Sequence, residues 1–193
     1  SACLVGSEMC IRDSRSPARL AARGFKLIGI ECEIGFRINK AFSARAEPYS
    51  RSEVLEAAEL HPTIEIVDSR YLDFRSLDRL SVLADNFSNG ALVCGAPAAD
   101  GQGAEWQGID LAHPPIAVSA DGKPFAEATG LRAGDPIGLL VELVNLVANR
   151  RGGVSAGTFV TTGTHTGMVF IEPGTEIIAD YGRLGRVEVS FVR

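Results

Sequence analysis

The sequence predicts an α+β domain dominated by short strands, with few helices. Three observations lead to this fold class. One segment alternates between apolar and other side chains, several shorter runs rich in β-branched residues are separated by glycine- or proline-containing turns, and only two segments carry helix signals. The length of 193 residues and the apolar fraction of 46% fit one globular domain with a sizeable core.

The clearest element is a strand over residues 26–38. Between Ile28 and Ile38, isoleucine, cysteine or phenylalanine occupies every second position, and glycine, glutamate or arginine occupies the positions between them. This period of two is the period at which side chains alternate between the two faces of a strand. One face is therefore expected to be buried and the other to carry polar groups.

A short helix and two further strands follow. Ser50 or Ser52 is a suitable N-cap for a helix that ends near the next proline. Residues 63–69 are rich in β-branched side chains and indicate a second strand, and residues 90–95 indicate a short buried strand. Residues 80–86 fit either a strand or a turn.

The second half of the chain contains a hairpin and the longest helix. Residues 107–130 indicate two strands joined by a turn at Asp121–Gly122, a dipeptide that favours tight hairpins. Asp135 is an N-cap candidate, Pro136 suits the first helical turn, and Gly152 ends the helix. Further strands are predicted over residues 158–162, 177–179 and 187–192. Many short strands with two helices give a mixed α+β domain.

Composition excludes several classes of protein. The 24 acidic and 19 basic residues give a net charge of −5, which argues against a nucleic-acid-binding surface. The longest apolar stretch, residues 136–148, is shorter than the ~20 residues of a membrane-spanning helix. No signal-peptide pattern opens the chain, and its four cysteines form no paired spacing, so we expect free thiols in a reducing, cytoplasmic setting.

The N-terminal residues differ from the rest of the chain. Residues 1–15 follow neither helical nor strand periodicity, and the stretch from Cys3 to Ser14 is similar to a translated sequencing linker. We therefore predict that residues 1–15 are not native, that the domain comprises residues 16–193, and that its natural N-terminal part is missing. The alternative is a genuine N-terminal arm of low order.

Three glutamates stand out on the predicted strands. Glu31 and Glu33 share one face of the first strand, with Cα atoms about 6.5–7 Å apart by strand geometry. Glu65 lies inside the apolar second strand, where a carboxylate must be exposed, paired or bound to a cation. If the three converge, a hard divalent cation such as Mg²⁺ or Mn²⁺ relieves their repulsion, because it prefers oxygen ligands. The alternative is a solvated strand face that binds nothing.

Four segments carry a combination of motifs that is more specific than any one of them. They are GIECEIGF (29–36), TIEIVDSRYLDF (63–74), LADNFSNG (83–90) and TTGTHTGMVFIEPGTEIIADYGRLGRVEVSF (161–191). Together they resemble the fumarylacetoacetate hydrolase superfamily, in particular its 2-keto-4-pentenoate hydratase branch, over about residues 17–193. The resemblance implies a mixed β-sandwich or β-roll catalytic domain. It also implies a divalent cation held by Glu31, Glu33 and Glu65, with Asp68 as the alternative third acid.

The resemblance implies an enzyme of aromatic-compound catabolism. In that branch a small 2-oxo or 2-hydroxy-dienoic acid chelates a metal ion through its carboxylate and its 2-oxygen. The implied activity is a lyase reaction that hydrates a 2-hydroxy-alka-2,4-dienoate to a 4-hydroxy-2-oxo acid. Ser88 and Thr164 are the implied contacts to the substrate, although each also fits ordinary turn or loop chemistry. A homo-oligomer is expected by analogy.

Other activities fit the same predicted site. A C–C bond hydrolase of acylpyruvates or a 2-oxo acid decarboxylase would use the same metal, whereas a structural domain or an inactive fragment would need none. Members of the branch carry a lysine-containing strand and an acidic loop upstream of the first two glutamates, with proton-transfer roles, and no segment here matches them. The sequence therefore assigns no catalytic acid or base.

The remaining polar candidates carry weaker signals. Lys26 lies too close to Glu31 to be the upstream lysine and fits a charge at a strand edge. His61 and His113 each precede a proline and are typical of turns or the surface. His165 follows the TGT motif but has no recognisable partner.

Overall fold

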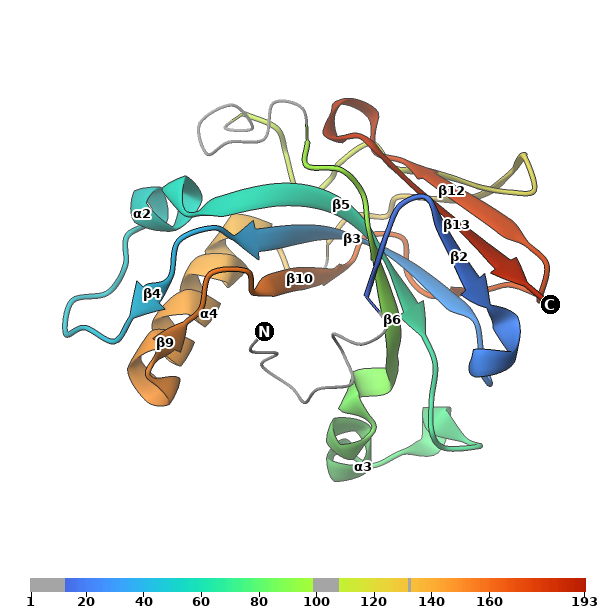
Figure 1. Ribbon diagram of the computed structural model, residues 1–193, viewed down its shortest axis with the longest axis horizontal. Coiled ribbons are helices and arrows are strands. Elements are labelled where there is room, and N and C mark those ends of the chain that lie inside the picture. Colours follow the sequence, from blue (N-terminus) through green and yellow to red (C-terminus); the bar gives the residue numbers. More distant parts are fainter. Residues whose placement is uncertain (1–12, 99–107, 132) are drawn as a thin grey trace.

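Two packed β-sheets form the body of the molecule (Figure 1). The structure, a computed structural model, describes residues 13–98, 108–131 and 133–193. In the first sheet the strands lie in the order β1 (Ser14–Arg15), β6 (Asn89–Cys94), β5 (Ala58–Val67), β3 (Gly29–Ile38) and β10 (Phe159–Thr164), and the short β11 (Val169–Phe170) also pairs with β3. β3 is antiparallel to both β5 and β10, whereas β1 is parallel to β6.

The second sheet contains strands from both ends of the sequence. Its strands lie in the order β2 (Ala18–Ala21), β13 (Arg186–Val192), β12 (Glu176–Asp180), β7 (Ala117–Ala120) and β8 (Lys123–Glu127). β2 and β13 are parallel neighbours although they lie at opposite ends of the sequence. A separate two-stranded pair is formed by β4 (Phe42–Ser43) and β9 (Gly153–Val154).

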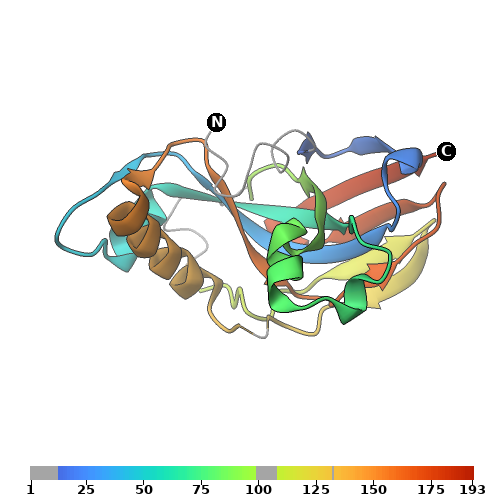
Figure 2. The ribbon, with the colours of Figure 1, turned by 90° about the horizontal axis from the view of Figure 1, so that it is seen from below.

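Helices cover one end of the first sheet and extend from another part of it. They are α2 (Arg51–Glu56), α3 (Arg79–Ala84) and α4 (Pro136–Arg151), with single 3₁₀ turns η1 (Ala22–Gly24), η2 (Phe74–Ser76), η3 (Asn86–Ser88) and η4 (Gly182–Leu184). Figure 2 shows α4 lying beside α2, with which it packs. Within the described part of the chain, no helix has the length and apolar character needed to cross a membrane.

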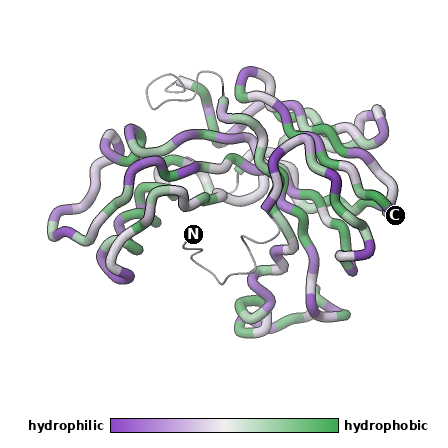
Figure 3. The backbone as a smooth tube through the Cα atoms, viewed as in Figure 1, coloured by the Kyte–Doolittle hydropathy of each residue, from purple (hydrophilic) through white to green (hydrophobic). Residues whose placement is uncertain are grey.

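The core lies between the sheets and beneath α4. Along β3 the inward side chains have no exposed surface; these are Ile30, Cys32, Ile34, Phe36 and Ile38. Tyr181, also fully buried, donates a hydrogen bond from its hydroxyl to the carbonyl oxygen of Thr63 and so ties the connection after β12 to β5. Figure 3 shows apolar residues running through the strands of both sheets. The predicted strand-dominated α+β fold is confirmed.

Several predicted caps and turns are also confirmed. Ser50 caps α2 through a capping box with Glu53, and Asp135 accepts a hydrogen bond from the N–H of Ile137 at the start of α4. Gly152 ends α4 in the left-handed conformation, with φ of 80°. The turn between β7 and β8 has positive φ at both of its central residues, 121 and 122, as a tight hairpin requires.

The predicted start of the second strand is wrong. β5 begins at Ala58 instead of residue 63, and α2 is correspondingly shorter than predicted. Pro62 therefore lies inside a central strand, a position where proline normally removes a ladder hydrogen bond. The carbonyl oxygen of Pro62 accepts a bond from the N–H of Gly95, just beyond the end of β6. In an antiparallel strand the nitrogen and the carbonyl oxygen of one residue face the same neighbour, so the nitrogen of Pro62 also faces Gly95. The N–H that proline lacks would therefore have paired beyond β6, and no residue of β6 loses a hydrogen-bond donor.

Residues 80–86 form neither a strand nor a simple turn. The carboxylate of Asp78 accepts hydrogen bonds from the N–H groups of Leu80 and Ser81 and begins the helix α3. The exposed side chains of Leu80 and Leu83 explain why apolar content alone did not predict an amphipathic helix here.

Candidate metal centre

The three predicted glutamates meet on the outer face of the first sheet. Each can offer one carboxylate oxygen, and these oxygens all lie within 4.8 Å of one another. The convergence follows from strand register, because Glu31 of β3 pairs directly with Glu65 of β5, and Glu33 is two residues further along β3. The predicted spatial arrangement of the three acids is therefore present.

Burial makes this cluster electrostatically costly. Glu33 is 2% exposed, and its desolvation, together with the charge of Glu65, raises the pKa of the Glu33 carboxyl to about 8. Desolvation and the charge of Glu65 likewise raise the pKa of Glu31 to about 7. The pKa of Glu65 is raised as well, chiefly by desolvation. A cation among the three would favour their ionised forms.

Two donors orient the carboxylates from neighbouring elements. The N–H of Gly163 donates to Oε2 of Glu33 at 3.1 Å, and the side-chain amide of Asn89 donates to Oε1 of Glu65 at 2.7 Å. Gly163 can make this contact because β10 has an irregular register between Thr161 and Thr164 and because Gly163 has φ of 102°, which favours glycine. The carboxylate of Glu31 has no hydrogen bond to another described residue.

The donor set fits a hard divalent cation. All three groups supply carboxylate oxygens, the ligand type that Mg²⁺ and Mn²⁺ prefer, and the described part of the chain brings no histidine or cysteine into the cluster. Asp68, the alternative third acid, has another role. Its Oδ1 accepts from the backbone N–H groups of Lys26, Leu27 and Ser69, so it fixes the segment that leads into β3.

The two predicted substrate contacts border the cluster from different elements. Ser88 lies in η3, next to Asn89, and its hydroxyl donates to Oδ2 of Asp85 at 3.1 Å. Thr164 lies opposite Glu33 in the register of β10 with β3, and its hydroxyl donates to the carbonyl oxygen of Gly167. Both positions are compatible with substrate contact, which stays a prediction.

The loop that holds Ser88 and Asn89 is strained and heavily hydrogen-bonded. Residues 86–88 all have positive φ, between 54° and 61°, although none of them is glycine. The buried Asp85 holds this loop by accepting bonds from the hydroxyls of Ser69 and Ser88 and from the N–H of Arg70. Arg70 in turn donates to the carbonyl oxygens of Asp85 and Asn89. Sequence reasoning treated this stretch as turn chemistry and missed Asn89.

The histidines lie in three different settings. His113 is exposed and pairs with Asp110, as expected for a surface residue. His61 is buried inside β5, so its assignment to a turn or the surface is wrong. His165 is also buried, and its Nε2 lies 2.9 Å from the carbonyl oxygen of Leu111, which makes this nitrogen the donor. His165 is not part of the carboxylate cluster.

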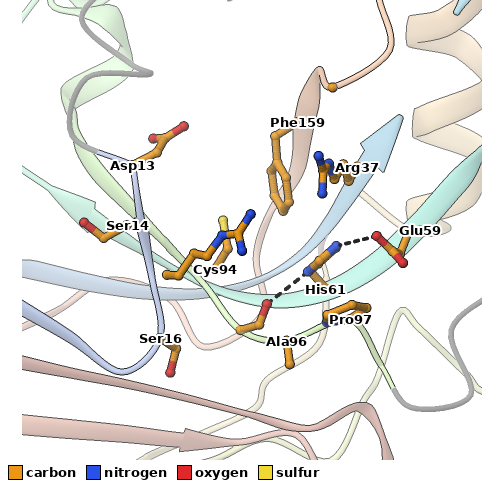
Figure 4. A pocket seen from close by; sticks show the side chains of 13 residues that line it. Asp13, Ser14, Ser16, Arg37, Glu59, His61, Cys94, Ala96, Pro97 and Phe159 are labelled. Carbon is orange, nitrogen blue, oxygen red and sulfur yellow. Dashed lines mark hydrogen bonds and ion pairs between the residues drawn. The ribbon is translucent and has the colours of Figure 1, made fainter. Parts of the chain in front are cut away.

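A pocket of about 570 Å³ lies beside the cluster on the same sheet (Figure 4). It is lined by residues of β1, β3, β5, β6 and β10 and of the segment after β6, including Arg37, His61, Cys94 and Phe159. The three glutamates do not line it. Cys94 and the core residue Cys32 are both free thiols, as predicted.

No family model matches the chain. Among curated proteins it is 35% identical over 132 residues to a 4-oxalocrotonate decarboxylase from Pseudomonas putida, covering 68% of this chain and 48% of that protein. It is 33% identical over 165 residues to a 4-oxalocrotonate decarboxylase from Pseudomonas sp. (strain CF600), covering 84% of this chain and 60% of that protein. The chain thus spans about half to three-fifths of the length of these relatives.

Solved structures that are similar to the chain include a protein with the same name as these relatives. The structure of 4-oxalocrotonate decarboxylase from Pseudomonas putida G7, complexed with magnesium and adipate, matches with a TM-score of 0.77 and 27% identity over 95% of this chain and 67% of that chain. Fumarylpyruvate hydrolase from Pseudomonas aeruginosa, in complex with Mn²⁺ and pyruvate, shares the fold, with a TM-score of 0.61 and 16% identity over 93% of this chain and 73% of that chain.

Fold, site and relatives define one class of protein. Two packed sheets with few helices and a carboxylate cluster on a strand face are the features that the sequence resemblance implied. The chain belongs to the fumarylacetoacetate hydrolase superfamily.

Proposed function

We propose that this chain carries the catalytic domain, residues 16–193, of a divalent-cation-dependent 2-oxo acid decarboxylase acting on 4-oxalocrotonate or a close analogue. The observation that carries the proposal is the cluster of three carboxylates within 4.8 Å on the outer face of β3 and β5. The named curated relatives, all 4-oxalocrotonate decarboxylases, support this activity over the hydratase expected from the sequence. Hydration and C–C hydrolysis stay predictions that the same assays test.

The proposed cation is Mg²⁺ or Mn²⁺, held by Glu31, Glu33 and Glu65. Structural neighbours are described with magnesium, calcium or manganese, which supports a divalent ion at this position. When bound, such an ion supplies a Lewis acid for the carboxylate and 2-oxo group of the substrate. Mg²⁺ prefers about six oxygen ligands, so three carboxylates leave positions for water or substrate oxygens.

The chain's own residues position the reacting groups. Gly163 and Asn89 hold Glu33 and Glu65 through the hydrogen bonds described above, which fixes where a chelated 2-oxo acid would lie. Burial of Glu33 keeps bulk water away from one side of the site. We assign Ser88 and Thr164 to contact the substrate carboxylate from the two flanking elements, where their hydroxyls can exchange their present loop contacts for the ligand.

Metal binding is the primary test. Mn²⁺ titrated calorimetrically into the chelator-treated chain should bind, and Glu33→Gln should weaken binding by at least the ~10–100-fold that loss of an outer partner costs a metal site. Glu176→Gln is the matched control, because Glu176 is an exposed strand residue of the second sheet. No binding above background, or equal binding by both variants, would refute the metal centre.

Activity assays separate the candidate reactions. The Mn²⁺-loaded chain is tested for CO₂ release from 4-oxalocrotonate, for hydration of 2-hydroxypenta-2,4-dienoate and for cleavage of an acylpyruvate. Release of CO₂ that depends on Glu33 supports the proposed decarboxylase. Turnover of only one of the other substrates would replace it by the corresponding hydratase or hydrolase.

A further inference from the structure

A second polar site lies on the same sheet face as the three glutamates. Side chains of β3 alternate, so Arg37 points to the same side as Glu33, four residues further along the strand. Arg37 lies directly opposite Glu59 on β5 and Phe159 on β10. It is thus located at the pocket shown in Figure 4, at the far end of the face from Glu31.

The guanidinium of Arg37 is available for a ligand. Its cross-strand neighbour Glu59 is instead engaged by His61, whose Nε2 lies 3.3 Å from a Glu59 carboxylate oxygen. The other ring nitrogen of His61 lies 3.0 Å from the carbonyl oxygen of Gly95. The side chain of Arg37 makes no hydrogen bond or ion pair with any residue that the structure describes. Arg15 of β1 also lines this pocket.

The pocket contains both acidic and basic side chains. Asp13 and Glu59 line it together with Arg15 and Arg37, but the carboxylate of Glu59 is engaged by His61. Guanidinium groups bind carboxylates through paired, charge-assisted hydrogen bonds. The end of the pocket at Arg37 therefore has the chemistry of a carboxylate-binding site.

An aromatic ring separates the two charged sites. A Cβ atom added to Gly35 would lie 2.4 Å from the ring of Phe159, so this ring lies against the sheet between Glu33 and Arg37. His61 packs against the same ring, with centroids 5.4 Å apart. Along β3 the outer face therefore presents carboxylates, then an apolar surface, then a guanidinium. A molecule with two acidic ends and a carbon chain between them matches this order.

We infer that Arg37 binds the far carboxylate of a six-carbon dicarboxylic 2-oxo acid whose near end lies at the metal centre, with Phe159 beneath the carbon chain. This inference rests on the proposed function, and it names the residue that would distinguish a diacid from a monoacid.

The length of such a diacid fits the sheet. An extended six-carbon chain places its carboxyl carbons about 6–7 Å apart, at about 1.5 Å per carbon–carbon bond. Chelation at about 2 Å and a charge-assisted hydrogen bond of about 2.8 Å extend the span from cation to guanidinium to roughly 12 Å. Four residues of strand cover about 13 Å.

The test compares two ligands that differ only in the far carboxylate. Binding of 2-oxoadipate and 2-oxohexanoate to the Mn²⁺-loaded chain is measured by calorimetry. We expect 2-oxoadipate to bind roughly 10- to 100-fold more tightly, as one charged hydrogen-bonded contact allows. Arg37→Ala should remove this difference while leaving Mn²⁺ and 2-oxohexanoate affinities unchanged. Arg19→Ala, which removes an exposed arginine of β2 outside the pocket, should preserve the difference.

The possible outcomes separate this inference from the proposed function. If Mn²⁺ and both ligands bind but with equal affinity, or if Arg37→Ala retains the preference for 2-oxoadipate, the Arg37 assignment is wrong and the metal centre stands. If the unmodified chain does not bind Mn²⁺, the proposed function and this inference both fall. Partial retention of the preference in Arg37→Lys would support a bidentate contact, since lysine keeps the charge but not the planar fork.

Discussion

On one face of β3, Ile30, Ile34 and Phe36 have no exposed surface; on the other, Glu31 and Glu33 converge with a third carboxylate. The same ten-residue strand, Gly29–Ile38, supplies both faces by alternation alone. The inner face stabilises the fold through apolar burial. The outer face opposes folding, because desolvated like charges raise one another's pKa. A surface that destabilises the free protein in this way is best explained by a ligand that it is built to hold.

The largest expected effect comes from the inner face. Phe36→Ala should lower the free energy of unfolding by about 3–5 kcal/mol, because it removes a fully buried ring from a packed core. Urea unfolding followed by circular dichroism measures this change. Phe125→Ala is the control, since Phe125 on β8 is 38% exposed and should cost less than about 1 kcal/mol. Similar losses in the two variants would contradict the division of roles between the faces.

The raised pKa of Glu33 on the outer face predicts that the free energy of unfolding falls as the pH rises. Folding raises the pKa of Glu33 from its ordinary value of 4.5 to about 8, so the folded chain binds this proton more tightly than the unfolded chain does. The stabilisation is present below pH 4.5 and is lost as the pH rises toward 8. Without divalent cations, Glu33 alone should lower the free energy of unfolding by up to about 1.4 kcal/mol per pH unit in this window.

Urea unfolding between pH 5 and 8, in the presence of a chelator, measures this slope. Glu33→Gln should make it shallower, because the amide does not titrate, while the raised pKa values of Glu31 and Glu65 still contribute. Adding Mn²⁺ at pH 8 should stabilise the unmodified chain and have little effect on the variant, since ligand binding to the folded state alone adds stability. Identical slopes in the two proteins would show that Glu33 is ionised in the folded chain without help, and the contrast between the faces would lose its electrostatic basis.

The sequence predicted the two faces of β3 much better than it predicted what surrounds them. Alternation identifies which side chains share a face, and this was sufficient to bring Glu31 and Glu33 together. Glu65 could be added because it interrupts an apolar strand, but its direct pairing with Glu31 depends on register, which no local pattern encodes. Pro62 was interpreted as the end of a helix, and this concealed both the early start of β5 and the burial of His61.

The residues around the site were harder to predict for a related reason. Asn89 precedes a glycine and follows a serine, a combination typical of turns, yet it starts β6 and donates to Glu65. Arg37 continues the polar face of β3, but nothing in the sequence shows that Glu59 leaves it unpaired by turning to His61. Such roles are set by contacts between segments distant in sequence.

Asn89 provides the smallest and most specific test of the outer face. Asn89→Ala removes only the donor to Glu65, since the backbone carbonyl of Asn89 keeps its bond from Arg70. Loss of a partner that orients a metal ligand should weaken Mn²⁺ binding by roughly 10-fold and leave the fold intact. Asn39→Ala, at an exposed loop position, should change neither property. Calorimetric Mn²⁺ affinities that are equal in Asn89→Ala and the unmodified chain would mean that register and burial alone orient Glu65, and that the outer face needs no supporting contacts to form its site.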